Sequence, residues 1–110
     1  MVSRRPRRGE VWLIAPGATV GREIQRPRPA LVVSPDELNG GLATVLIAPM
    51  TTGHHPYPFR VPCRFQGKSG HVVLDQLRAV DRSRLVKRLG VLEPGTVARG
   101  LAVLREMFED

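Results

Sequence analysis

The sequence predicts a mainly β protein in which five to seven short strands form a small, strongly bent antiparallel sheet or open barrel, followed by one C-terminal helix. Short apolar segments recur at close spacing and are separated by segments rich in glycine and proline. No segment of helical period lies between them, so the alternation of strands and helices that is typical of a parallel sheet is missing. Only the last apolar positions of the chain change to a helical period.

The N-terminus is expected to be a flexible basic arm over residues 1–8, because it carries four arginines and almost no apolar side chain. A first strand is predicted over residues 9–15, where a glycine precedes the apolar segment and a Pro-Gly pair ends it. Its Trp12 is assigned to the core and not to base stacking. The following segment, residues 16–27, is a loop of the length that is often functional or mobile.

Two apolar segments at the centre of the chain predict paired strands. Residues 29–33 form a continuous apolar segment behind Arg28, a pattern typical of a strand that is buried on both faces. A third strand is predicted over residues 44–50, and it ends in Thr51-Thr52. If these two strands pair, a guanidinium group and two hydroxyl groups converge at one edge of the sheet.

The next elements follow from proline, glycine and capping patterns. Ser34 is expected to cap a single helical turn, with Glu37 three residues after the cap. Residues 59–62 predict a short edge strand, because the proline there cannot donate to a central ladder. Residues 64–70 contain two glycines and are expected to turn.

The last part of the chain predicts more strands and then a helix. Strands are expected over residues 71–75, 77–80 and 85–92. A helix of about 15 residues is expected to begin near Pro94. Its apolar positions recur at spacings of four, three and four residues, which places them on one face: Val97, Leu101, Leu104 and Phe108.

Length and composition limit the class of protein. The 110 residues suffice for one domain, which is expected over residues 9–110. No apolar segment approaches the roughly 20 residues of a membrane-spanning helix, and the N-terminus lacks the apolar centre of a signal peptide, so a cytoplasmic location and no membrane partner are expected. The single cysteine, Cys63, cannot form an internal disulfide bond, which agrees with a reducing compartment.

The charge of the chain indicates a polyanionic partner. The net charge is +7, and all but two of the 17 basic residues precede residue 93. Arginine far outnumbers lysine, and its planar guanidinium group binds phosphate through two hydrogen bonds and stacks on bases. Selection for RNA or DNA binding and a bias in genomic base composition both explain this excess, and the composition does not decide between them.

Six blocks of the sequence resemble, in their order and spacing, the MazF/PemK toxins of bacterial toxin–antitoxin modules. The resemblance extends from about residue 8 to residue 108, and it departs from the family pattern at Ala15–Ala18, after the first strand. The recognition sequence of known members is therefore not transferred. The blocks are Gly9-Glu10-Val11-Trp12, Gly21-x-Glu23, Arg28-Pro29-Ala30-Leu31-Val32-Val33-Ser34-Pro35, Pro49-Met50-Thr51-Thr52, Tyr57-Pro58-Phe59 and Val73-Leu74-Asp75-Gln76-Leu77-Arg78.

The resemblance implies a CcdB/MazF-type fold, which is an SH3-like barrel with a C-terminal helix that works as a homodimer. It also implies an endoribonuclease that needs neither a metal nor a cofactor, cuts single-stranded RNA at a short sequence and thereby inhibits translation. An acidic MazE-like antitoxin is expected to inhibit the toxin, and operator DNA is expected to bind only with the antitoxin.

The same resemblance implies roles for individual residues. Arg28 and Thr51 match the catalytic pair of the family. Beside the resemblance, Tyr57 and Phe59 are the candidates for base stacking, and one of the two is expected in the core. Four arginines are either an ordinary solvated surface or phosphate contacts: Arg78, Arg82, Arg84 and Arg88. The remaining positions match residues that line the same groove: Glu23, Thr52, Asp75 and Gln76.

The chemistry of RNA cleavage is compatible with these residues. The 2′-hydroxyl group of RNA can attack the adjacent phosphorus without a metal, and Arg28 could stabilise the charge that develops on the phosphoryl oxygens. Arginine stays protonated at neutral pH and is a poor general base. The base is therefore left open among Asp75, Glu23, His54, His55 and His71.

Other functions are weaker explanations of the sequence. A toxin of the same fold that inhibits a protein such as DNA gyrase would act through the end of its C-terminal helix, and the ending Met107–Asp110 does not resemble those toxins. A non-catalytic SH3-like nucleic-acid-binding module would keep the basic surface but would not need Arg28 beside Thr51. No metal site is expected, because His54, His55 and Cys63 lack a recognised ligand spacing.

Overall fold

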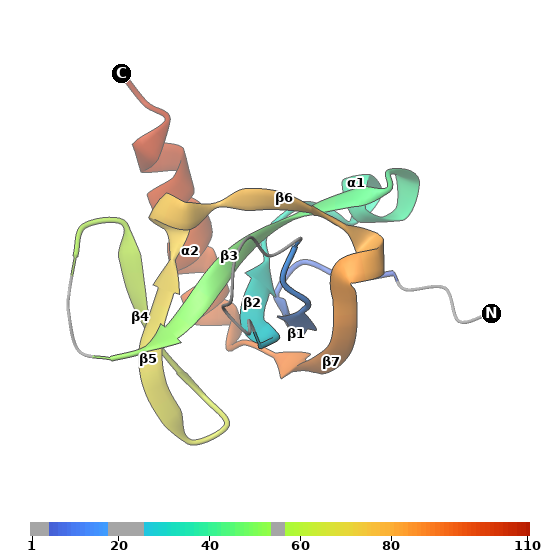
Figure 1. Cartoon of the computed structure of the whole chain (residues 1–110). Coiled ribbons are helices and arrows are strands. Elements are labelled where there is room, and N and C mark those ends of the chain that lie inside the picture. The colour runs from blue at the N-terminus through green and yellow to red at the C-terminus, as the bar shows by residue number, and fades with distance from the viewer. Residues whose placement is uncertain (1–4, 18–25, 54–56) are drawn as a thin grey trace.

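The computed structural model describes residues 5–17, 26–53 and 57–110, and it confirms a mainly β chain with a C-terminal helix (Figure 1). Within these residues the chain forms seven strands, two α-helices and two short 3-10 helices. In chain order they are β1 (Glu10–Ile14), β2 (Arg28–Val32), α1 (Asp36–Gly41), β3 (Thr44–Thr52), β4 (Arg60–Phe65), β5 (Lys68–Val73), η1 (Leu74–Gln76), β6 (Arg78–Asp81), η2 (Arg82–Arg84), β7 (Leu85–Val91) and α2 (Pro94–Met107).

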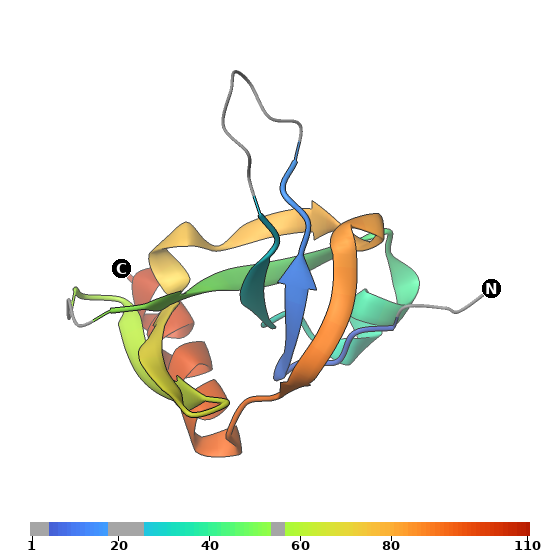
Figure 2. The same cartoon turned by 60° about the horizontal axis from the view of Figure 1, so that its bottom comes forward.

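The strands form one antiparallel sheet in the order β4-β5-β3-β2-β1-β7, and β6 pairs separately with β3. The nine-residue strand β3 organises this sheet, because its first half pairs with β6 and its end pairs with β5. Figure 2 shows how strongly the sheet curves around β3. Strand β4, which contains Pro62, lies at one edge as predicted.

The sheet is buried on both faces near β2. Leu31 belongs to a core between the sheet and α2, whereas Ala30 and Val32 belong to a second core on the other face. This arrangement confirms the burial expected from the continuous apolar segment. No helix in the described part of the chain is both long and apolar enough to cross a lipid bilayer.

The C-terminal helix packs largely as its period predicts. Val97, Leu101 and Leu104 contact the core that contains Leu31. The exception is Phe108, which lies just past the end of α2 and is 75% exposed. The helical period therefore identified the correct face of α2, but Phe108, the last of the four predicted positions, lies beyond the core that the helix covers.

The predicted helix cap at Ser34 is wrong. Helix α1 begins at Asp36 with Pro35 at the N-cap position, and no side chain caps it. The buried Ser34 hydroxyl donates to Asn39 Oδ1 and accepts the Leu46 N–H at 3.0 Å. Because Leu46 is brought next to Ser34 only by the folding of β3, a distant backbone group competes successfully with the local cap.

The expectation of a flexible arm over residues 1–8 needs correction for residues 5–8, and residues 1–4 lie outside the described residues. Pro6 is fully buried, and the Arg7 N–H donates to Glu10 Oε1 at 2.7 Å. Arg8 donates its N–H to Asp36 and its Nε to the Val33 carbonyl. These hydrogen bonds attach the segment to the barrel, a connection that composition does not reveal.

The turn expected over residues 64–70 is shorter than predicted. Strands β4 and β5 pair up to Phe65 and Lys68, so only Gln66 and Gly67 form the loop. Both residues have positive φ, 51° for Gln66 and 79° for Gly67. A two-residue hairpin loop requires such values. The two glycines therefore indicated the position of the turn correctly, but the predicted turn was longer than the actual loop.

Candidate active site

Strands β2 and β3 bring together the arginine and the threonines identified in the sequence. Leu31 pairs with Ala48 and Ala30 with Pro49, which confirms the predicted strand pairing. Arg28 precedes Ala30 by two residues and Thr51 follows Pro49 by two, so both lie at the same end of the two paired strands. Both residues also line one cleft.

Arg28 lies between two clefts. The first, which we call the threonine cleft, has a volume of about 690 Å³ and also contains Thr51. The second, the arginine cleft, has a volume of about 890 Å³. Arg28, Pro29 and Pro49 line both of them. A ligand that occupies both clefts therefore passes over Arg28.

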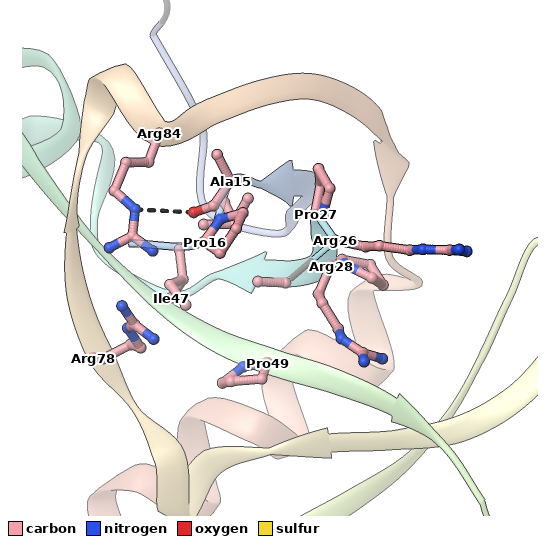
Figure 3. A pocket seen from close by; sticks show the side chains of 12 residues that line it. Ala15, Pro16, Arg26, Pro27, Arg28, Ile47, Pro49, Arg78 and Arg84 are labelled. Atoms are coloured by element: carbon pink, nitrogen blue, oxygen red, sulfur yellow. Dashed lines mark hydrogen bonds between the residues drawn. The ribbon is translucent and has the colours of Figure 1, made fainter. Parts of the chain in front are cut away.

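The arginine cleft is strongly basic. Figure 3 shows Arg78 and Arg84 on one side of Pro49 and Arg28 on the other. Arg84 donates its Nε to the Ala15 carbonyl at 2.9 Å, which fixes part of its guanidinium group. The remaining lining is mainly apolar, so the cleft combines cations with uncharged walls. The lining residues are Ile14, Ala15, Pro16, Arg26, Pro27, Arg28, Pro29, Ala30, Ile47, Pro49, Arg78 and Arg84.

The threonine cleft has a more mixed lining. Thr52 and Gln76, two residues that the resemblance implies for the RNA groove, line it together with Arg28 and Thr51. Its other end is formed by the β4–β5 hairpin and by Leu89 of β7. The lining residues are Arg28, Pro29, Pro49, Met50, Thr51, Thr52, Cys63, Phe65, Gln66, Lys68, Ser69, Gly70, Gln76 and Leu89.

Two predicted site residues line neither cleft. Asp75 forms a salt bridge with Arg60, whose Nε lies 3.1 Å from Asp75 Oδ1, and the Arg60 guanidinium lies 4.9 Å from the centroid of the Tyr57 ring. The hydrogen bonds from Arg60 lower the pKa of Asp75. Tyr57 is 57% exposed and Phe59 is 44% exposed, so neither of these aromatic rings is buried in the core.

The candidates for a general base are only partly described. Glu23, His54 and His55 lie outside the described residues. His71 pairs with Thr51 across β5 and β3, although it lines neither cleft. Asp75 is already bound to Arg60. Of the described candidates, His71 is therefore the one that the sheet places beside Thr51.

Several residues of the two clefts were not predicted. They form two groups: Arg26 in the arginine cleft, beside the already proposed Arg84, and Gln66 and Lys68 in the threonine cleft. The excess of arginine before residue 93 was a signal for the first group. The second group had no signal, because it comes from a hairpin loop whose position depends on the tertiary structure.

The Gly9–Trp12 block has a structural explanation. Glu10 Oε2 accepts from Arg88 Nε at 2.6 Å, and Oε1 accepts from the Trp12 indole at 3.1 Å. Burial by itself raises the pKa of Glu10, but the hydrogen bonds from the Arg7 N–H, Arg88 and Trp12 outweigh burial and leave the pKa below its usual value. Trp12 is 8% exposed, so its assignment to the core is confirmed.

Metal-binding and nucleophilic groups are sparse in the described part of the chain. Among residues 5–17, 26–53 and 57–110, no three His, Cys, Asp or Glu side chains lie close enough to share a metal ion. Cys63 lines the threonine cleft, but burial raises the pKa of its thiol. A raised pKa favours the protonated thiol, which is the less reactive form.

The fold and the site together define a class of protein: a small SH3-like barrel with a covering C-terminal helix and a cationic cleft beside an arginine–threonine pair. The chain belongs to the PemK-like, MazF-like toxins of type II toxin–antitoxin systems, since the model of this family matches residues 7–108. The family inferred from the sequence motifs is confirmed.

Named relatives support the same assignment. The endoribonuclease toxin MazF of Escherichia coli K12 is 35% identical over 100 residues, which cover 89% of this chain and 86% of the relative. The endoribonuclease PemK of Escherichia coli is 35% identical over 88 residues, which cover 74% of this chain and 66% of the relative.

Solved structures agree with the fold. A crystal structure of MazF from Deinococcus radiodurans superposes with a TM-score of 0.79 at 30% identity, covering 96% of this chain and 97% of that one. A MazE–MazF crystal structure from the same organism gives a TM-score of 0.75 at 31% identity and covers 96% of both chains. The CcdB/MazF-type fold expected from the resemblance is therefore confirmed.

Proposed function

We propose that this chain is an endoribonuclease toxin whose domain, residues 9–110, cuts single-stranded RNA at a specific short sequence without a metal or another cofactor. The observation that carries this proposal is that Arg28 and Thr51 line the same mixed polar cleft and that Arg28 also lines the neighbouring, strongly basic cleft. The names of the Escherichia coli relatives support it. Cleavage of messenger RNA in the cytoplasm would stop translation and growth.

In the proposed reaction the 2′-hydroxyl group of the RNA attacks the adjacent phosphorus. The bond to the 5′-oxygen of the next nucleotide breaks, and this oxygen takes up a proton, which balances the proton that the 2′-hydroxyl group gives up. The products are a 2′,3′-cyclic phosphate and a 5′-hydroxyl end. Arg28 donates hydrogen bonds to the phosphoryl oxygens as negative charge develops, a type of stabilisation worth ~3–4 kcal/mol per donor. The Thr51 hydroxyl donates to the same group.

The surrounding residues bind the RNA on both sides of this phosphate. Arg78 and the arginine cleft neutralise neighbouring phosphates, while Thr52 and Gln76 offer hydrogen-bonding groups in the threonine cleft. Tyr57 presents an exposed ring on which an RNA base can stack. We also propose Asp75 and Glu23 as further RNA contacts.

The proton of the 2′-hydroxyl group needs an acceptor. Imidazole is the most common general base in enzymes, and strand pairing places His71 opposite Thr51. The carboxylate of Asp75 is less suitable, because Arg60 binds it and lowers its pKa. Among the described residues, we therefore favour His71 as the base.

The test is the cleavage of a long unstructured RNA in the presence of EDTA, followed by mapping of the fragment ends. We expect the wild type to cut at one recurring short sequence and to leave 5′-hydroxyl ends. Arg28→Ala is expected to lower kcat by about 100- to 1,000-fold, because one charge-stabilising donor is lost. The matched control is Arg99→Ala, which removes an exposed arginine of α2 that lines neither cleft.

Intact RNA with a correctly folded wild type would refute the nuclease. RNA binding without cleavage would then indicate a non-catalytic nucleic-acid-binding module. Inhibition of DNA gyrase by the same preparation would instead indicate a toxin with a protein target. Equal loss of activity in Arg28→Ala and Arg99→Ala would show that net charge, and not the position of Arg28, supports the reaction.

The proposed toxin acts as a homodimer and is held inactive by an acidic MazE-like antitoxin. The exposed Phe108 lies beside a groove of about 300 Å³ that Leu77, Leu101 and Leu104 also line, and a second copy of the chain would cover this apolar surface. The MazE–MazF complexes of Deinococcus radiodurans support the antitoxin. Operator DNA is expected to bind only the toxin–antitoxin complex. Sedimentation of the isolated chain and of its complex tests both assemblies.

A further inference from the structure

The threonine cleft extends well beyond Arg28 and Thr51, into a part that the proposed cleavage step does not use. Three residues of the β4–β5 hairpin, Phe65, Gln66 and Lys68, line this part together with Leu89 of β7. We propose that it is a nucleotide subsite, which binds the base and a phosphate of a nucleotide next to the bond that is cut. This inference rests on the proposed function and names residues that select its substrate.

The hairpin is held against β7 by contacts outside the strand ladder. Gln66 donates its Nε2 to the Leu89 carbonyl at 3.2 Å. A Cβ atom at Gly90 would lie only 3.3 Å from Phe65 Cζ, so the aromatic ring packs closely on the backbone of β7. These contacts fix the wall of the cleft at the end opposite to Thr51, and a fixed wall is what a selective binding site requires.

The backbone conformation of Gln66 points to a function of its side chain. Gln66 and Gly67 are the two central residues of the hairpin loop and have positive φ. Asn-Gly is the favoured pair at these positions, because asparagine tolerates a positive φ better than glutamine does. Loop geometry alone therefore does not explain the glutamine, whose longer side chain reaches both β7 and the cleft.

The lining of this part has the chemistry of a nucleotide site. The Phe65 ring and Leu89 supply apolar walls for the planar face of a base. The Gln66 amide keeps its oxygen acceptor and a second N–H for the edge of that base. Lys68 is exposed, and none of the salt bridges found among the described residues involves it, so its ammonium group can bind a phosphate.

The two lysines of the chain provide a matched pair for the test. Lys68 lines the threonine cleft, whereas Lys87 is exposed on β7 and lines neither cleft. The probe is a 2′-O-methyl RNA with the cleavage sequence of the wild type, because it has no free 2′-hydroxyl group and stays intact. If Lys68 binds one phosphate, Lys68→Ala lowers the slope of log Kd against log salt by about 0.7, while Lys87→Ala leaves the slope unchanged.

Gln66→Asn tests the selection of the base. Asparagine suits the loop, so melting should show a stability equal to or above that of the wild type. The shorter amide no longer reaches the same position, so the preference for one base of the cleavage sequence should fall by about 10-fold or more, with cleavage retained. This preference is read by sequencing the ends cut from an RNA pool with randomised positions.

Two results would overturn the subsite. One is an unchanged salt slope in Lys68→Ala together with an unchanged cleavage sequence in Gln66→Asn. The other is a loss of antitoxin affinity in Lys68→Ala with unchanged RNA affinity, which would assign this part of the cleft to the acidic antitoxin. A wild type that binds RNA but does not cut it would refute the nuclease alone, because the salt slope of Lys68→Ala could then be measured on that uncut RNA and would still decide the subsite.

Discussion

Gly70 packs against the backbone of Thr51, the proposed catalytic threonine, and its replacement gives a quantitative test of the proposed site. Gly70 lies in β5, where it pairs with Thr52 and is buried. A Cβ atom at this position would lie 1.9 Å from the Thr51 carbonyl oxygen and 2.9 Å from its carbonyl carbon. Real Cβ atoms do not approach a backbone oxygen below 3.0 Å, so Gly70→Ala must move β5 and β3 apart by about 1 Å or more.

This displacement should affect activity more than stability. Forcing an additional carbon into a packed site typically costs about 1–3 kcal/mol, which lowers the melting temperature but leaves most domains folded. A misplacement of about 1 Å in an active site can lower the rate by about 100-fold. Since the displaced atoms belong to Thr51, we expect kcat of Gly70→Ala to fall by about 100-fold.

The assay is RNA cleavage at a temperature where circular dichroism shows the variant to be fully folded. The control is Gly40→Ala, because a Cβ at Gly40 would meet no atom within 4 Å apart from its chain neighbours and the backbone of its own helix, and alanine favours the helix α1 that contains it. This variant should keep the wild-type kcat. A folded Gly70→Ala with wild-type kcat would refute the reasoning, since the position of Thr51 would then not matter for catalysis.

Two more predictions concern titratable groups. Folding lowers the pKa of Glu10 below its ordinary value of 4.5. At pH values above 4.5 the carboxylate therefore stabilises the native state, and this contribution is lost as the pH falls through the lowered pKa. Urea unfolding should show Glu10→Gln to be about 1–3 kcal/mol less stable than the wild type at pH 7, and its stability should fall less in acid. If the free energies of unfolding of the two proteins changed in parallel with pH, the stabilising role of the Glu10 carboxylate would be contradicted. His71→Ala should lower kcat by about 100-fold or more in a folded protein, measured at saturating RNA, and an unchanged kcat would exclude His71 as the base.

Much of the fold could be predicted because it depends on local patterns. The apolar segment behind Arg28 identified β2, the threonines after the next segment identified the end of β3, and the pairing of the two strands followed. The spacing of Val97, Leu101 and Leu104 identified the face of α2 that packs on the core. These patterns are reliable because side-chain direction alternates along a strand and repeats along a helix in a fixed way.

Local patterns failed where a residue had a choice of partners. Ser34 has the sequence context of a helix cap, yet it bonds to Asn39 and to the Leu46 N–H, which becomes available only after β3 has folded. Arg8 belongs to a segment with the composition of a free arm, yet it donates to the Val33 carbonyl 25 residues away. In both cases a distant backbone group offers the better hydrogen bond.

The sequence by itself therefore determined the family, the barrel with its C-terminal helix, and the pair of Arg28 and Thr51 at one end of the sheet. Only the tertiary structure decided the shape of the two clefts and the residues that form their far walls. Gln66 meets Leu89 across 23 residues, and Arg84 meets Ala15 across 69. The physical reason is that a strand pattern specifies which side chains share a face, whereas a cleft depends on how far the sheet curves and which distant loops close it.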